Sequence, residues 1–306
     1  MKTIMNVIYS TFALFTLPCF ALAQQAPESV SIRVITTFDY PGTGNFTLPQ
    51  KINDAGDIVG YYIDTATLAD RGFVRFANGN FSAPIVEPND TCMDTRARGI
   101  NNSRLVCGEY YNGADCSAHG YFLSGGSFSE FDVPGSLDTL VVGVNNVGDF
   151  CGGFTDSSGI QQAFVSLGGT ITPFSVPGAS STFAAQLNSS NQLVGNYVDS
   201  SEIVHGYVRN ANGTLHFPID PSGSTNTALR GNNDSNWIVG YYTDSGGMFH
   251  GLFFVPPNRF FSFDYPGSAS TLFTGINAQG FICGYYTDDF GLHGVLARVS
   301  VRTGGK

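Results

Sequence analysis

The chain has 306 residues, a formal net charge of −10 and 12% charged residues, with abundant Gly (38), Phe (26) and Tyr (14). This acidic balance argues against nucleic acid and anionic membrane as partners. The plentiful glycine and aromatic residues favour many short strands joined by tight turns, and no helical periodicity of useful length follows Ala23. We therefore expect an all-β protein.

Residues 1–23 have the pattern of a secretory signal peptide. Lys2 precedes an apolar run that ends in the motif "ALA", which fits the small-x-small rule for cleavage. A retained membrane anchor is the alternative, but Thr16 and Pro18 interrupt the run, and a cleavage motif follows it. We expect a mature chain without a membrane span, either secreted or held in the periplasm.

The rest of the chain repeats one phrase, written "GINAQGFICGYYTDDFGLHG" in its last copy. Aligned on the glycine of "VGYY", the copies fall at Gly60, Gly108, Gly152, Gly195, Gly240 and Gly284. Periods of 43 to 48 residues indicate propeller blades or solenoid turns. The repeated phrase is therefore expected to be scaffold, and function is expected where the copies differ.

Each unit is expected to form four short strands, as in "TLVVGVNN", "GDFCGGFTD", "QQAFVSL" and "TITPFSV" of the third unit. An asparagine, called the repeat Asn below, stands seven residues before each anchor glycine: Asn53, Asn101, Asn145, Asn188, Asn233 and Asn277. Asn at the first position of a type I turn suits a hairpin between the first two strands. We interpret the repeat Asn as a turn residue.

Six units of four strands predict a six-bladed β-propeller. The last unit stops after its third strand, while the chain begins with an orphan strand that resembles the fourth strands of other units. We expect residues 31–38 to complete the last blade and close the ring; an open β-solenoid would not need this docking. Residues 24–301 would form one domain, followed by a disordered tail at 302–306.

The phrase "GINxxGxIxGYYxDxxGxxHGF", followed by "FDYPG", resembles the HAF family of probable extracellular bacterial repeat proteins over essentially the whole mature chain. The resemblance implies an extracellular, propeller-like repeat protein of bacterial type, and it implies no catalytic residue. His is followed by Gly at four units (His119, His205, His250 and His293), while Arg71 and Gln162 replace it in the other two.

Repeated His and Asp residues could form metal or acid–base sites. Each pair belongs to its own blade, so the pairs do not converge, and we favour a hydrogen bond across each blade loop. The acidic residues of the "DYPG"-like stretches would form an upper rim that could hold Ca²⁺, or serve as ordinary turn residues: Asp39, Asp132, Asp220 and Asp264. A repeated Thr six residues before each repeat Asn would either line the channel mouth or bond a neighbouring backbone.

Candidate ligand residues occupy the position three before the repeat Asn, where the units carry Gln50, Arg98, Val142, Ala185, Arg230 and Thr274. Arg98 and Arg230 belong to opposite blades, and Arg96 lies near the upper end of the same strand as Arg98. Because Arg binds carboxylates in a bidentate fashion, Gln50, Arg96, Arg98 and Arg230 could bind an anionic ligand such as a uronate-bearing glycan. The alternative is that these arginines pair with acids of neighbouring blades.

Two of the cysteines, Cys92 and Cys116, fall in loops expected on the upper face of the second unit. We predict a disulfide between them, worth about 3 kcal/mol. Cys107, Cys151 and Cys283 each precede an anchor glycine where other units have Val, so we expect them to be buried apolar residues. Tyr residues at repeat positions, such as Tyr241 and Tyr285, are expected to pack between blades.

No nucleophile elbow, HExxH, CxxC or phosphate-cradling loop is present. We favour a secreted, monomeric, non-catalytic binding propeller whose channel mouth takes a glycan, an anionic small molecule or an extracellular protein. The alternative is a calcium-supported hydrolase or lyase, which would need Asp or Glu side chains from three or more blades to meet on the axis. A third alternative is a purely structural surface module without a polar pocket.

Overall fold

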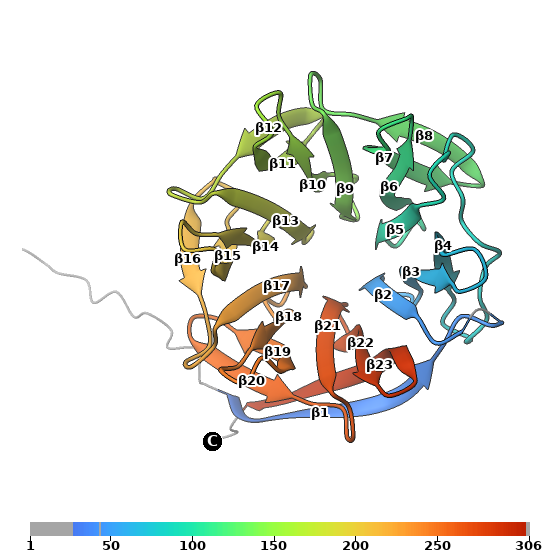
Figure 1. Ribbon diagram of the computed structural model, residues 1–306. Coiled ribbons are helices and arrows are strands. Elements are labelled where there is room, and N and C mark those ends of the chain that lie inside the picture. The colour runs from blue at the N-terminus through green and yellow to red at the C-terminus, as the bar shows by residue number, and fades with distance from the viewer. Residues whose placement is uncertain (1–26, 43, 304–306) are drawn as a thin grey trace, which may run out of the picture.

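The computed structural model describes residues 27–42 and 44–303, so the expected signal peptide at 1–23 lies outside the described residues. The described chain is all-β, and its sheets are arranged as six blades around a central axis (Figure 1). The six-bladed propeller expected from the repeat is confirmed. The described residues include no helix that could span a membrane.

The blades follow chain order, and every neighbouring pair of strands within a blade is antiparallel. Blade one contains β2 (Thr47–Ile52), β3 (Ile58–Asp64) and β4 (Ala69–Arg75). Blade two contains β5 (Thr95–Ile100), β6 (Val106–Asn112), β7 (Ser117–Ser124) and β8 (Ser127–Phe131). Blade three contains β9 (Asp138–Val144), β10 (Phe150–Thr155), β11 (Gln161–Leu167) and β12 (Thr170–Phe174). Blade four contains β13 (Ser181–Leu187), β14 (Leu193–Val198), β15 (Val204–Arg209) and β16 (Leu215–Ile219). Blade five contains β17 (Asn226–Asn232), β18 (Ile238–Thr243), β19 (Phe249–Val255) and β20 (Arg259–Phe263).

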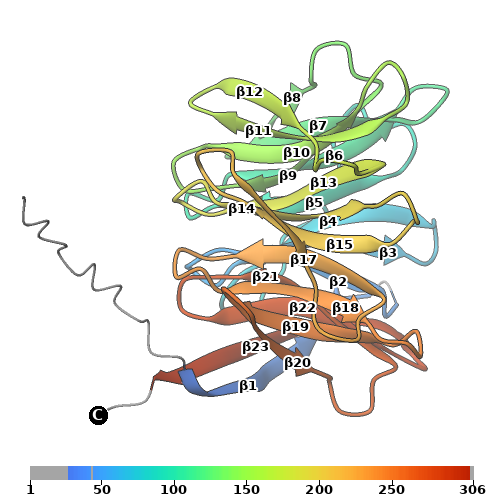
Figure 2. The ribbon, with the colours of Figure 1, turned by 90° about the vertical axis from the view of Figure 1, so that its left-hand side faces the viewer.

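Blade six joins the two ends of the chain. It contains β21 (Ser270–Ile276), β22 (Phe281–Asp288), β23 (Gly291–Thr303) and β1 (Pro27–Phe38), and β1 lies beside β23 in both Figure 1 and Figure 2. The expected closure by residues 31–38 is confirmed. Residues 302 and 303 do not belong to a disordered tail, because they extend β23 by pairing with Ser29 and Pro27 of the long β1.

Blade one departs from the four-stranded pattern. Its sheet has three regular strands, and beyond β4 there are only isolated bridges: Asp70 with Asp94, Gly72 with Ile85 and Arg75 with Phe81. Pro84 lies between Phe81 and Ile85 and has no backbone N–H to donate to a ladder. The expectation of four regular strands in every unit is therefore wrong for this blade.

The anchor glycines explain why the phrase repeats. A Cβ atom on Gly195 would collide with the backbone carbonyl of Phe183 on the inner strand and with the ring of Tyr207 on the third strand. Tyr207 uses the space that the glycine leaves free, since its Oη donates to that same carbonyl at 3.1 Å. Gly108 has the same arrangement. The phrase is thus a packing requirement within each blade.

The repeat Asn residues hold the blades together as well as forming the turns. In Asn145, Oδ1 accepts the backbone N–H groups of Val147 and Asp149, as a turn residue should, while Nδ2 donates to the carbonyl of Asn188 in the next blade at 3.2 Å. The same inter-blade bond recurs around the whole ring and closes from Asn277 to Asn53 at 3.0 Å. The turn interpretation describes only half of what this side chain does.

Candidate functional site

A β-bulge in every inner strand aims one side chain at the channel. Between the inner and second strands, the register skips the residue three before the repeat Asn in all six blades: Gln50, Arg98, Val142, Ala185, Arg230 and Thr274. An extra residue of this kind leaves the ladder and redirects its side chain. All but Thr274 line one cavity of about 220 Å³. The bulge therefore brings together the position that the sequence singled out.

The cavity has a polar side and an apolar side. Blades one, two and five contribute Gln50, Lys51, Arg98 and Arg230. Blades three and four contribute mainly apolar residues, with one polar residue, Asn196, on β14: Leu140, Val142, Phe183, Ala184, Ala185 and Asn196. A ligand of this cavity would therefore meet positive charge on one face and mostly hydrocarbon on the other.

Arg98 is paired within its own blade. Its guanidinium contacts Glu109 on β6, with Nη2 at 2.6 Å and Nε at 2.8 Å from Oε1, and the Glu109 side chain is fully buried. The remaining nitrogen, Nη1, donates to Gln50 Oε1 at 3.3 Å. The alternative that these arginines pair with acids thus holds for Arg98, although its partner lies in the same blade and not in a neighbouring one.

Arg230 has no such partner. Its Nη2 donates to Gln50 Oε1 at 3.4 Å, its Nε is buried without a hydrogen-bond acceptor, and no ion pair forms between it and any described residue. Gln50 therefore bridges the arginines of opposite blades. The structure brings Gln50, Arg98 and Arg230 together and leaves Arg230 uncompensated.

Arg96 is not part of this cluster. Its Nε lies 2.7 Å from Asp70 and its Nη2 lies 2.8 Å from Asp94, and it does not line the cavity. Burial raises the pKa of Asp94 to about 6, against the opposing effect of Arg96. Since two carboxylates already neutralise Arg96, we place it above the site as a structural residue and not as a ligand-binding one.

Lys51 belongs to the site, and the sequence analysis missed it. It stands two residues before the repeat Asn, where Gly99, Gly143, Gly231 and Gly275 stand in other units. Its side chain is only 3% exposed, and Nζ donates to the carbonyl of Thr274 at 3.1 Å. Burial, followed by the positive charge of Arg230, lowers the pKa of Lys51 to about 7. The signal in the sequence was the replacement of a recurrent glycine by the one long cationic side chain at that position.

Two tyrosines of the second strands also face the cluster. Tyr241 lines the cavity, and the Arg98 guanidinium lies 5.1 Å from the ring centroid of Tyr61. Such a separation allows a cation–π contact, which orients the guanidinium. Tyr241 was expected only to pack between blades, but it also lines the cavity.

The repeat histidines form hydrogen bonds within separate blades. His205 Nδ1 lies 2.7 Å from Asp220 of the rim, and its Nε2 lies 3.5 Å from Asp199 of the neighbouring loop. His250 and His293 are placed in the same way between two carboxylates. The rim aspartates are thus partners of the histidines. Within residues 27–42 and 44–303, no group of three or more His, Cys, Asp or Glu side chains gathers in a way that could hold a metal ion.

The repeat threonines are not available to a ligand. Thr95 and Thr182 are fully buried, and their hydroxyls accept the backbone N–H groups of Glu87 and Val176 in the connections that enter their blades. The interpretation of the threonines as backbone-bonding residues is confirmed for these blades.

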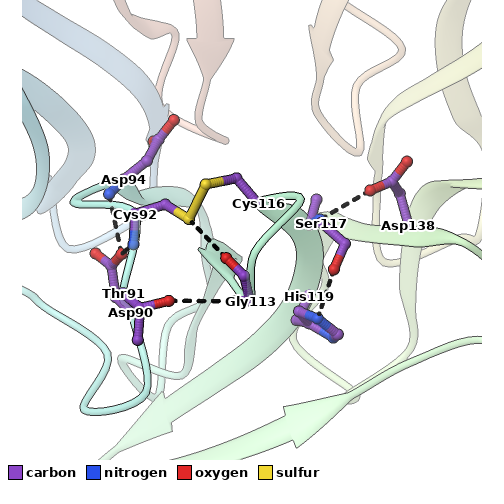
Figure 3. The surroundings of a disulfide bond; sticks show 10 residues. Asp90, Thr91, Cys92, Asp94, Gly113, Cys116, Ser117, His119 and Asp138 are labelled. Atoms are coloured by element: carbon purple, nitrogen blue, oxygen red, sulfur yellow. Dashed lines mark hydrogen bonds between the residues drawn. A yellow bond between two sulfur atoms is a disulfide. The ribbon is translucent and has the colours of Figure 1, made fainter.

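The predicted disulfide is confirmed. Cys92 and Cys116 are joined, with their Cα atoms 5.9 Å apart, and Figure 3 shows the bridge between the loop before β5 and the loop before β7. The Thr91 hydroxyl accepts the Gly113 N–H at 3.1 Å beside it. Cys107, Cys151 and Cys283 are free and buried, as expected.

No protein-family model matches the sequence, and no curated protein sequence matches it. Solved structures do resemble the fold. AofleA from Arthrobotrys oligospora has a TM-score of 0.57 at 11% identity over 91% of each chain. A mutant of Aleuria aurantia lectin in complex with Fucalpha1-6GlcNAc has a TM-score of 0.56 at 10% identity, covering 86% of this chain and 99% of the lectin. Trypanosoma rangeli sialidase has a TM-score of 0.54 at 12% identity, covering 89% of this chain and 60% of the sialidase. At such identities the likeness shows that this chain shares the propeller fold, and the fold alone.

Proposed function

We propose that this protein is a non-catalytic binding propeller, acting as a monomer, whose channel holds a carboxylate-bearing ligand such as a sugar acid or the acidic sugar of a glycan. The observation that carries the proposal is Arg230, a half-buried arginine whose buried Nε lacks an acceptor and which faces Gln50 and Arg98 across one cavity. An uncompensated guanidinium is best satisfied by a carboxylate, which accepts two parallel hydrogen bonds.

The opposite side of the cavity supports the choice of a sugar acid. Val142, Phe183 and Ala185 present hydrocarbon there, beside the polar Asn196. Tyr241 adds an aromatic ring from blade five, the blade that carries Arg230. A sugar ring offers apolar C–H faces to such a surface while its carboxylate reaches the arginines. The lectins among the similar structures bind fucose-containing sugars, which makes a glycan a reasonable ligand class for this fold.

We further propose that the protein works outside the cytoplasm and belongs to the HAF family. The Cys92–Cys116 bridge supports an oxidising compartment, where such bonds persist. The competing function is a calcium-supported hydrolase or lyase, which would need acids from three or more blades on the axis. Among the described residues, Glu109 is the acid that contacts a cavity arginine, and it already forms an ion pair with Arg98.

The proposal is tested by thermal unfolding with galacturonate and, as the neutral match, galactose. A ligand that binds only the folded state raises the melting temperature by mass action. We expect galacturonate to raise it in the wild type, galactose to leave it unchanged, and Arg230→Met to lose the response. Arg298→Met is the control, because Arg298 stacks on Phe281 away from the cavity. An equal response to both sugars, or an unaltered response in Arg230→Met, would contradict the proposal.

A further inference from the structure

The channel contains an amine that the proposed binding function does not use. Lysine occurs in this sequence only at positions 2, 51 and 306, whereas arginine serves at every other basic position. Lys51 is thus the one lysine among the described residues, and it lines the cavity with only 3% of its surface exposed. Burying an ammonium group is costly unless a counter-charge is present, so the placement of this side chain needs a reason.

The surroundings of Lys51 oppose its protonation. Its nearest partner is a neutral carbonyl, that of Thr274, and no described carboxylate lies within ion-pair distance of Nζ. The charged groups that face it are the guanidiniums of Arg230 and Arg98, and the other titratable groups that face it are the buried thiols of Cys151 and Cys283. A lysine desolvated beside another cation is the usual arrangement for an amine that acts as a nucleophile.

The lowered pKa has a direct consequence for the amine. At an ordinary pKa of about 10.4, roughly one lysine in 2,500 is unprotonated at pH 7. With the pKa of Lys51 lowered to about 7 by burial and by Arg230, about half of the molecules would carry a free amine at that pH. The nucleophilic form is therefore well populated in the same cavity that presents two guanidiniums.

We propose that Lys51 reversibly captures a 2-oxo acid in the channel as an imine, with Arg230 and Arg98 holding the carboxylate next to the reacting carbonyl. This inference rests on the proposed carboxylate site and goes beyond it, because it adds a covalent step. The cavity of about 220 Å³ suits a small acid of this class. The functional groups match the site, since a 2-oxo acid carries an anion and an electrophilic carbon side by side.

The step balances without a co-reactant. The Nζ lone pair forms a bond to the carbonyl carbon, and the carbonyl electron pair moves to oxygen, which takes a proton from the nitrogen and gives a carbinolamine. The carbon–oxygen bond then breaks while the nitrogen lone pair forms the C=N bond. The oxygen leaves as water with both hydrogens of the original amine, so nothing is oxidised or reduced.

The test uses reductive trapping of the full-length protein with glyoxylate and sodium cyanoborohydride at pH 7, followed by peptide mapping. Reduction of the imine fixes it as a carboxymethyl group on the lysine. We expect Lys51 to be labelled about tenfold faster than Lys306, or more, and to be labelled saturably. Glycolaldehyde is the matched neutral aldehyde, and it should label Lys51 more slowly than glyoxylate does.

Variants separate the imine from the carboxylate site. Lys51→Arg keeps a positive charge but cannot form an imine, so its channel should take no label. Arg230→Met keeps the amine and should remove the preference for glyoxylate over glycolaldehyde. Because Lys51→Arg could disturb the buried cluster, near-ultraviolet circular dichroism of each variant checks the fold, and the wild-type labelling ratio of Lys51 to Lys306 decides the question without any variant.

Labelling of Lys51 no faster than Lys306 would overturn the imine while leaving the carboxylate site to be judged by the galacturonate experiment. Fast labelling of Lys51 with no preference between glyoxylate and glycolaldehyde would overturn the 2-oxo acid as the ligand and the carboxylate site with it, leaving only a reactive amine.

Discussion

Arg230 on blade five reaches the side chain of Gln50 on blade one, with Nη2 lying 3.4 Å from Oε1. The same oxygen accepts from Arg98 of blade two, so a neutral amide occupies the place between two guanidiniums where an anion would bind more strongly.

Replacing that amide by a carboxylate should imitate the ligand. Gln50→Glu places a negative charge against Arg230 and Arg98, and charged hydrogen bonds of this kind contribute about 1.5–3 kcal/mol. We expect a higher melting temperature without ligand and no further rise with galacturonate. Gln50→Met, which removes the hydrogen bonds without adding charge, should lower the melting temperature. A full galacturonate response in Gln50→Glu would place the ligand elsewhere.

The repeat asparagines should contribute to stability through two separate roles. Asn145→Ala loses two turn hydrogen bonds and two inter-blade bonds, from Nδ2 to the Asn188 carbonyl and to Asn191 Oδ1, at a buried position. We expect it to cost about 2–4 kcal/mol in the free energy of unfolding. Asn145→Asp keeps the acceptor that forms the turn but removes the Nδ2 donor. The loss in unfolding free energy of this variant, compared with that of Asn145→Ala, therefore measures the share due to the inter-blade bonds. Denaturant unfolding measures both.

The matched control is Asn78→Ala, because Asn78 forms a turn bond to Asn80 in an exposed outer hairpin and does not contact another blade. We expect its effect to stay below about 1 kcal/mol. If Asn145→Asp were as stable as the wild type, the ring of inter-blade bonds would have no energetic role.

The disulfide of blade two should account for a measurable share of stability. Cys92 and Cys116 are 24 residues apart, and loop closure of that length predicts a loss of about 3 kcal/mol in the Cys92→Ser, Cys116→Ser double variant. The expected decrease in melting temperature is several degrees. Reductant should lower the melting temperature of the wild type to that of the double variant and leave the melting temperature of the double variant unchanged. A decrease in the double variant would point to another cause.

Stability should depend on pH through the repeat histidines. Burial opposes protonation of His205, His250 and His293, but the hydrogen bonds and charges of their two aspartates outweigh it, so the pKa of each is raised. A group with a raised folded-state pKa stabilises fully below its unfolded pKa, about 6.5, and that contribution is lost as the pH rises through the folded value.

The measurement is the difference in melting temperature between the wild type and the triple variant with Gln at these histidines, from pH 5 to 8. We expect the difference to be largest near pH 5 and to shrink toward pH 8. Comparing the two proteins at each pH cancels the titration of Lys51, which both retain. A difference that is independent of pH would show that the histidines stabilise the loops only as neutral hydrogen-bonding groups.

Several features could be predicted from the sequence because they depend on neighbours along the chain. The spacing of the anchor glycines sets the number of blades, since each copy builds one hairpin array of its own. The likeness of residues 31–38 to other fourth strands predicted the closure, and two cysteines in upper loops of one unit predicted the disulfide. The bulge position was identified only as a place where the copies disagree.

Whether a cation at the bulge position is neutralised depends on which residues the other strands place beside it. Arg98 and Arg230 occupy the same place in their units, yet only Arg98 has a glutamate beside it, because Glu109 follows an anchor glycine where blade five has Tyr241. Lys51 lines the cavity next to the bulged Gln50, and its Nζ reaches the Thr274 carbonyl where the inner strands of blades one and six approach closely. The sequence by itself determined the six-bladed scaffold, its closure and its disulfide, since local patterning specifies strands and turns. Only the tertiary structure decided which cations remain uncompensated, because that depends on groups 48 to 180 residues apart in the chain that meet at the axis.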